Sequence, residues 1–122
     1  MILGVGFDLC SVKRISKAIE HENFLTRVFS IDEINYCNSK KSGRFESYAA
    51  CFAAREAFMK ASGVSLAKLL GENFTLAHDN ATKKPFIKLN DDELAKEFVN
   101  KKISVSISHE NDLAGAIVII EE

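Results

Sequence analysis

The sequence predicts an α+β domain in which helices pack on a mostly antiparallel sheet. Three observations carry this prediction: an apolar, β-prone start from Ile2 to Cys10, an alanine-rich segment from Phe45 to Ser62 without glycine or proline, and an alternation of apolar residues with serines from Ile103 to Ser108. Alternation with a period of two is typical of a strand, whereas a long run of good helix formers is typical of a helix.

Length and composition limit the possible classes of protein. The chain has 122 residues, which suits one domain, 1–122, and is too short for two ordinary ones. An apolar fraction of 47% excludes a disordered chain, and a formal net charge of −1 argues against a nucleic-acid-binding protein. The start lacks the charged segment of a signal peptide, no apolar run approaches the ~20 residues of a membrane span, and three cysteines without C-x-x-C spacing predict reduced thiols in a cytoplasmic protein.

The first half of the chain is expected to hold a buried strand followed by helices. The strand from Ile2 to Cys10 is apolar until Asp8, and Ser11 then has the position of an N-cap for a helix that begins at Val12. Residues 24–29 predict a short second helix, and Ser30 to Glu33 form a capping box whose turn Ile34 and Cys37 continue; the two are counted as one helix in the predicted order. The clearest helix runs from Phe45 to Ser62, with Gly63 as its C-cap, and its six alanines let another backbone approach closely.

The second half is expected to be mainly strands. Phe74 to His78 and Pro85 to Leu89 flank a turn, and Asp91 or Asp92 can cap a short helix that runs to about Val99. The alternating strand that begins at Ile103 is joined by His109 to Asp112 to a last strand from Leu113 to Ile120. The predicted order is therefore β-α-α-α-β-β-α-β-β.

Asp8, Glu56 and Lys60 are the first candidate site residues. A buried, unpaired carboxylate is costly, so the charge of Asp8 needs compensation, unless Asp8 simply caps the next helix. Glu56 and Lys60 are four residues apart and share a helix face, which is either an interior face or the position of an ordinary surface ion pair. Two carboxylates suit Mg²⁺, which also takes water and substrate phosphates, and a lysine can neutralise a phosphate.

His109 is the other candidate, because it ends the alternating strand beside Ser108 and faces the turn. A solvated loop histidine is the alternative interpretation. Neither Ser106 nor Ser108 stands at a spacing from His109 that supports a hydrolase triad.

Three segments resemble motifs of the phosphopantetheinyl transferases, and they occur in the same order. Gly6-Phe7-Asp8-Leu9, followed by Arg14, is similar to the G-x-D-x(5)-R opening of that family. The segment from Phe52 to Gly63 resembles its F/W-A-A-K-E-A-x-x-K-A-x-G helix, and the segment from Ser104 to His109 resembles the V-S-I-S/T-H strand of the small, acyl-carrier-protein synthase type. With its length, the chain is identified as a member of that small type.

The resemblance implies an activity. The family transfers the 4′-phosphopantetheine arm of coenzyme A to a serine of apo acyl carrier protein in fatty acid biosynthesis, with Mg²⁺, and releases adenosine 3′,5′-bisphosphate. Asp8 and Glu56 match its metal ligands, Lys60 completes the catalytic set, and either Glu56 or a water held by the metal is the base. The resemblance implies contacts with coenzyme A for Lys60, His109, Arg55, Arg44, Gly63 and Ser108, and contacts with the carrier protein for Arg14, Lys13 and Lys17.

The resemblance also implies a homotrimer with active sites between subunits, which gives a reason for the apolar last strand, 116–120. Three positions depart from the family pattern: Arg55 replaces a lysine, Cys51 stands where relatives often have arginine, and Lys83 stands where the hairpin usually has glycine. We hypothesise that Arg44, or Arg55 itself, supplies the charge missing at Cys51. The competing function is a non-catalytic module that binds a nucleotide or a carrier protein, which would not need both Asp8 and Glu56.

Overall fold

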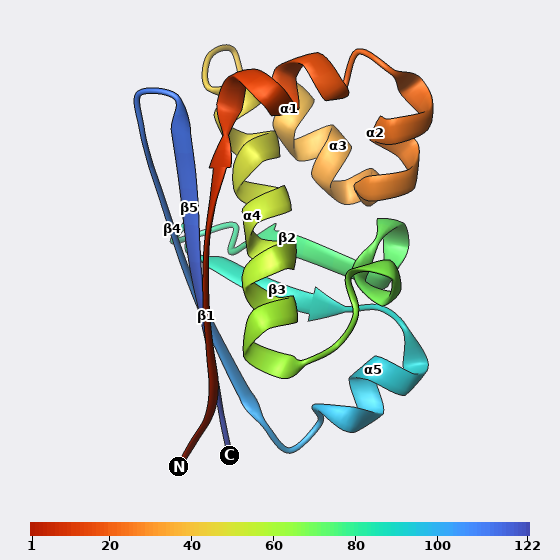
Figure 1. Cartoon of the computed structure of the whole chain (residues 1–122), viewed down its shortest axis with the longest axis vertical. Helices are drawn as coiled ribbons and strands as arrows, with labels where there is room; N and C mark the ends of the chain where they lie inside the picture. The colour runs from red at the N-terminus through yellow and green to blue at the C-terminus, as the bar shows by residue number, and fades with distance from the viewer.

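The computed structural model describes all 122 residues and has the α+β architecture that the sequence predicts. Figure 1 shows a layer of strands covered on one side by helices, with the long helix α4 against the strands. In chain order the elements are β1 (Ile2–Ser11), α1 (Val12–Ala18), α2 (Glu22–Val28), α3 (Ile31–Asn38), α4 (Arg44–Ser62), two 3₁₀ turns (Leu66–Leu69 and Gly71–Asn73), β2 (Phe74–His78), β3 (Pro85–Leu89), α5 (Asp92–Glu97), β4 (Lys102–Glu110) and β5 (Leu113–Glu121).

The strands form two antiparallel sheets where one was expected. The larger has the order β1-β5-β4, and the smaller contains β2 and β3. The structure also has one more helix than predicted. Phe29 leaves the helical conformation, with φ −106° and ψ 146°, so the capping box of Ser30 and Glu33 begins a separate helix, α3, and does not continue α2.

Helix α4 lies unusually close to β1. A Cβ atom on Gly6 would overlap the carbonyl oxygen of Ala57, and one on Gly4 would overlap that of Ala61. The two glycines and the alanines therefore let the helix backbone touch the strand, as the alanine content predicted. Because α4 is held this closely, the Lys60 side chain on the helix reaches Asp8 on the strand.

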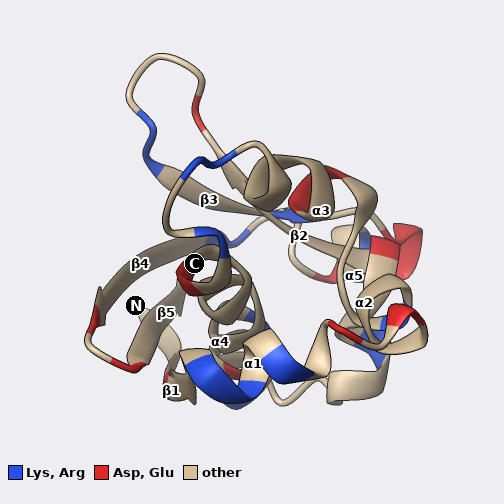
Figure 2. Cartoon of the chain, turned by 90° about the horizontal axis from the view of Figure 1, so that it is seen from above, with Lys and Arg blue, Asp and Glu red and all other residues tan.

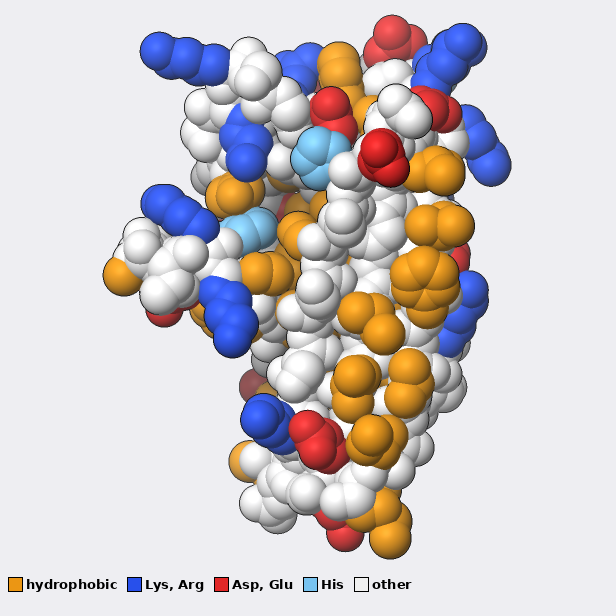
Figure 3. Space-filling model, turned by 90° about the vertical axis from the view of Figure 1, so that its left-hand side faces the viewer, with side chains coloured by type: hydrophobic (Ala, Val, Ile, Leu, Met, Phe, Trp, Pro, Cys, Tyr) orange, Lys and Arg blue, Asp and Glu red, His pale blue; other side chains and the backbone are white.

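The strand β1 is not buried on both faces, which corrects the expectation from its apolar sequence. Gly6 and Asp8 face α4, whereas Val5, Phe7 and Leu9 on the other face are 53%, 56% and 54% exposed. Figure 3 shows a band of apolar side chains along this outer face of the sheet. The residues that form it, here called the outer apolar face, are Leu3, Val5, Phe7, Leu9, Leu113 and Ile117.

The last strand divides in the same way. Ala116, Val118 and Ile120 are buried against the helices, and Ile117 points to the outer apolar face. The expectation that one domain leaves residues 116–120 uncovered is therefore right only for Ile117 and, in part, Ile119. None of the helices has both the length and the apolar character that crossing a membrane requires.

Candidate active site

Asp8 and Lys60 meet where the end of β1 passes α4. The Lys60 Nζ donates hydrogen bonds to Asp8 Oδ1 and to the carbonyl oxygen of Phe7, each at 3.0 Å. Asp8 is nearly buried, and the Lys60 side chain is 49% exposed. Ser11, and not Asp8, caps α1, because its hydroxyl accepts from the Arg14 amide. The structure thus favours a compensated interior carboxylate over a helix-capping role for Asp8.

Glu56 lies one turn before Lys60 and lines the same cavity as Asp8. Burial raises the pKa of Glu56, the charge of Asp8 and a hydrogen bond with Asp8 raise it further, and Lys60 partly opposes them. Lys60 forms its ion pair with Asp8 and not with Glu56, so the alternative of an i,i+4 surface pair is wrong. The two candidate carboxylates are neighbours, as predicted.

The cavity shared by the two carboxylates has a volume of about 310 Å³. Arg14 from α1 is the one cation that lines it, and Cys10 and Phe52 contribute to its wall. No group of three or more histidine, cysteine, aspartate or glutamate side chains is gathered anywhere in the chain. A pair of carboxylates with open space fits Mg²⁺, which keeps several waters and binds substrate phosphates, and does not fit the four protein ligands of structural zinc.

The basic residues of α1 lie as expected. Lys13, Arg14 and Lys17 are all exposed, while Ile15 is buried beneath them. Figure 2 shows this basic helix beside α4, with acidic residues more frequent on α2, α3 and α5. The patch therefore borders the carboxylate cavity, although the whole chain is nearly neutral.

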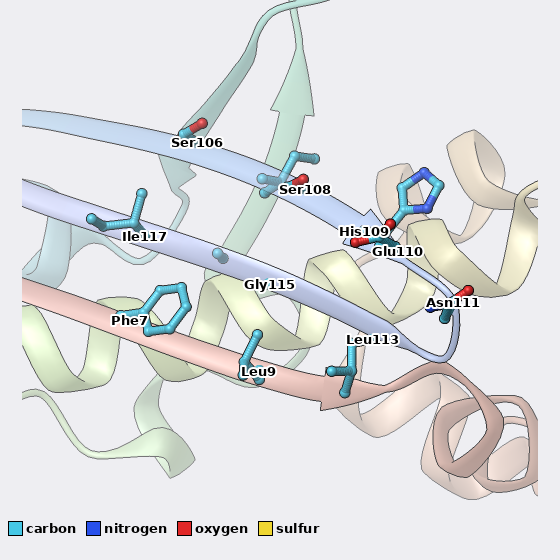
Figure 4. Close-up of a pocket in the computed structure, with 12 residues that line it drawn as sticks. Phe7, Leu9, Ser106, Ser108, His109, Glu110, Asn111, Leu113, Gly115 and Ile117 are labelled. Carbon is cyan, nitrogen blue, oxygen red and sulfur yellow. The ribbon is translucent and has the colours of Figure 1, made fainter.

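His109 does not share the carboxylate cavity. It lies at the end of β4 and lines a larger cavity, of about 640 Å³, beside Lys40, His78 and Lys83. It also reaches the edge of a shallow cavity of about 400 Å³ on the outer apolar face, which Ser108 lines as well. In Figure 4, Phe7, Leu9 and Leu113 lie along this outer cavity, with His109 near the hairpin end of β4.

Two further predicted residues are placed at the ends of α4. Arg44 begins the helix, is exposed, and lines a polar depression together with Lys40 and Lys41. Gly63 is the predicted C-cap, with φ +78°, a conformation that glycine adopts without strain. The positions of Arg44 and Gly63 do not show whether either residue contacts coenzyme A.

Arg55 is the clearest correction to the predicted site. Its side chain is fully buried and forms an ion pair with Glu33, whose side chain is also fully buried. Its remaining donors reach the carbonyl oxygens of Leu69, Gly71 and Phe74 at 2.8–3.2 Å. With no exposed surface and no free donor, Arg55 has a structural role and is not a contact for coenzyme A or a replacement for the charge missing at Cys51.

Glu33 is the residue whose second role the sequence did not reveal. The capping box was predicted and is present, since the Glu33 carboxylate accepts from the Ser30 amide at 3.0 Å. The same carboxylate also accepts from the Leu76 amide and from Arg55. The only signal of this pairing in the sequence was an arginine 22 residues after Glu33, and the sequence does not show that it is buried.

Known proteins resemble this chain over its full length. The model of the 4′-phosphopantetheinyl transferase superfamily matches residues 4–118. A holo-[acyl-carrier-protein] synthase of Treponema denticola is 40% identical, covering 99% of both chains, and one of Halothermothrix orenii is 39% identical, covering 100% of this chain and 99% of the relative.

Solved structures are similar as well. The crystal structure of holo-[acyl-carrier-protein] synthase from Neisseria meningitidis has a TM-score of 0.87 at 30% identity and covers both chains completely. The Helicobacter pylori protein, solved in complex with coenzyme A, has a TM-score of 0.80 at 32% identity, covering 96% of this chain and 99% of that one.

Proposed function

This chain belongs to the 4′-phosphopantetheinyl transferase superfamily, and from that premise we propose that it transfers the 4′-phosphopantetheine group of coenzyme A to a serine of apo acyl carrier protein. The observation that carries the proposal is that Asp8 and Glu56 line one cavity while Lys60, one turn after Glu56, is bonded to Asp8. A module that only bound a nucleotide or a carrier protein would have no need for two adjacent carboxylates, one of which has a raised pKa.

The transfer exchanges one phosphorus–oxygen bond for another. The serine oxygen of the carrier protein bonds to the phosphorus that carries pantetheine, and the bond from this phosphorus to the bridging oxygen breaks. Adenosine 3′,5′-bisphosphate leaves with the bridging oxygen. Negative charge grows on the phosphate oxygens during this exchange, so the residues that stabilise it should lie beside the diphosphate.

Asp8 and Glu56 are the residues that would hold Mg²⁺, whose charge would stabilise the diphosphate when it is bound. Lys60 can turn from Asp8 to a phosphate oxygen, because its side chain is half exposed and makes only two hydrogen bonds. Either Glu56 or a water that the metal would hold is the group that would accept the proton of the serine hydroxyl.

The nucleotide end of coenzyme A is assigned to the cavity of about 640 Å³ that His109 lines. Lys40 and Lys83 on its wall supply positive charge for phosphate groups, and Arg44 lies in the polar depression that Lys40 also lines. Ser108 and Gly63 are proposed as further contacts, on the family pattern alone. The Helicobacter pylori relative was solved with coenzyme A, which supports a coenzyme site in this fold.

The outer apolar face supports a homotrimer with active sites between subunits. Asp8 and His109 line different cavities of one chain, so a complete site that uses both is more easily built from two chains. A second copy would cover Phe7 and Leu9, which are more than half exposed in the single chain. We also propose a cytoplasmic location and a place in fatty acid biosynthesis, because the family acts there.

The test is intact-mass spectrometry of apo acyl carrier protein after incubation with the chain, coenzyme A and Mg²⁺. The expected result is the mass increment of one phosphopantetheine group. Asp8→Ala and Glu56→Ala should abolish it, whereas Glu93→Ala, on the exposed side of α5, should leave it unchanged. Binding of coenzyme A without any increment would favour the non-catalytic module.

A further inference from the structure

The hairpin between β4 and β5 is joined to the first turn of α1 by one residue, Asp112. Ser11 Oγ donates to Asp112 Oδ2 and the Lys13 amide donates to Asp112 Oδ1, both at 2.8 Å. The Val12 amide donates to the Asp112 carbonyl oxygen, also at 2.8 Å. These contacts connect parts of the chain about 100 residues apart, and they satisfy donors that the start of a helix would otherwise leave free.

The link continues from Ser11 to Arg14. Ser11 Oγ accepts a hydrogen bond from the Arg14 amide at 3.2 Å while it donates to Asp112. Its hydroxyl is thus oriented by the carboxylate and then caps the helix. Arg14 lines the cavity that holds Asp8 and Glu56. Asp112 is therefore two hydrogen bonds away from the backbone that carries Arg14.

Helix α1 is short, and besides Asp112 its start is held by the pairing of Ser11 with Leu113 and by the packing of Val12 against the core. It has seven residues, and Ile15 is its one buried side chain. Isolated helices of this length are unstable in water, so the position of α1 depends on its caps and tertiary contacts. The hydrogen bonds from Ser11 and Lys13 lower the pKa of Asp112, which keeps the carboxylate ionised and a strong acceptor at neutral pH.

We propose that Asp112 is a positioning residue for the carrier-protein substrate, which holds the first turn of α1 so that Arg14 stands at the carboxylate cavity with the exposed Lys13 on the same turn. The inference rests on the proposed function, because it takes the basic face of α1 as the docking surface for an acidic carrier protein. Asp112 does not touch a substrate in this arrangement; it acts through Ser11 and the helix backbone.

The proposal predicts a selective kinetic effect. Asp112→Ala removes two hydrogen bonds and should raise the KM for apo carrier protein about tenfold. The kcat at saturating carrier protein and the KM for coenzyme A should both stay within about twofold, because the pairing of β4 with β5 does not need the Asp112 side chain. Asp112→Asn keeps one acceptor oxygen and should restore most of the loss.

The matched control is Asp91→Ala. Asp91 also caps a short helix, by accepting from the Leu94 amide of α5 at 3.2 Å, and it lines none of the cavities described above. Both KM values should be unchanged in this variant. An Arg14→Ala background supplies a second control, since Asp112→Ala should add little once Arg14 is absent.

The experiment has a second measurement that does not depend on transfer activity. Amide hydrogen exchange at residues 12–15 should be faster in Asp112→Ala than in the unchanged chain, and exchange in α5 should not change. An unchanged KM for carrier protein, an equal rise in both KM values, or unchanged exchange in α1 would each overturn the proposal. Absence of transfer by the unchanged chain would instead count against the proposed function, and the exchange result would still report whether Asp112 anchors α1.

Discussion

Helix α4 carries an ion pair on each of two faces, and the two pairs differ in their exposure to water. Arg55 and Glu33 have side-chain exposures of 0% on one face, whereas Lys60 and Asp8 have exposures of 49% and 10% on the other. Arg55 is held by Glu33 and by carbonyl oxygens from three separate positions. Lys60 makes two hydrogen bonds and is free to exchange them for a ligand.

The comparison shows how one helix separates stability from chemistry. A buried pair with every donor used cannot take a substrate, and removing one partner leaves a buried, uncompensated charge. A half-exposed pair contributes little to stability and can rearrange. Arg55 directly precedes Glu56, so neighbouring residues of α4 face the buried ion pair and the cavity of Asp8.

The largest effect on folding is expected at Arg55. Arg55→Met should lower the free energy of unfolding by about 3–5 kcal/mol, because the Glu33 carboxylate would stay buried without its cation. Urea denaturation followed by circular dichroism measures this change. Arg27→Met, an exposed position on α2, should alter stability by less than about 0.5 kcal/mol. Equal effects at the two arginines would remove the distinction between the faces.

The next effect is expected at Glu56 and concerns activity alone. Glu56→Gln should lower the rate of pantetheine transfer about 100-fold to 1,000-fold, because it removes one of the two carboxylates that share the cavity proposed for the reaction. In metal-free buffer its melting temperature should equal or exceed that of the unchanged chain, since the raised pKa of Glu56 means that its charge opposes folding. A large loss of stability in Glu56→Gln would show that the face of α4 with Glu56 also stabilises the fold, as the face with Arg55 does, and would contradict the comparison.

The fold was largely predictable because several signals agreed for each element. The long helix was expected over 45–62 and spans Arg44–Ser62, since its composition, its lack of glycine and proline, and the C-cap at Gly63 all point the same way. The separation of α2 from α3 was missed. The capping box was visible in the sequence, but the helix breaks because the backbone of Phe29 is extended. The ring of Phe29 packs on Tyr48, which lies in α4, and the local sequence does not show this contact.

The proximity of Asp8, Glu56 and Lys60 was predictable, because a motif set both residue and spacing. The role of Arg55 was not predictable, because the local sequence does not show which face of α4 packs against Glu33 and the carbonyl oxygen of Leu69. The outer face of β1 was misjudged for a related reason. An apolar sequence indicates that something covers the strand, but it does not say whether the cover belongs to the same chain.

A smaller effect on activity and almost none on folding is expected at Lys60. Lys60→Met should reduce the transfer rate about 10-fold to 100-fold, because the charge growing on the diphosphate would lose one cation. The free energy of unfolding should change by about 1 kcal/mol or less, since the Lys60 side chain is half exposed and water screens its charge, although Asp8 itself is only 10% exposed. Steady-state kinetics and urea denaturation of the same preparation give both values. A stability loss as large as that of Arg55→Met would contradict the comparison.

The smallest effect is a pH dependence that Glu56 should give to stability. Burial and the charge of Asp8 raise its pKa above the ordinary value of 4.5, so the folded chain keeps this proton to higher pH than the unfolded chain. The contribution of Glu56 to stability is therefore greatest below pH 4.5 and is lost as pH rises through the folded pKa. Between about pH 4 and 7, the melting temperature of Glu56→Gln should rise relative to that of the unchanged chain in metal-free buffer. A difference in melting temperature that stays constant with pH would mean that the pKa of Glu56 is not raised by folding. Asp8 and Glu56 would then not be a closely spaced pair, and the contrast between their face of α4 and the buried face of Arg55 would fail.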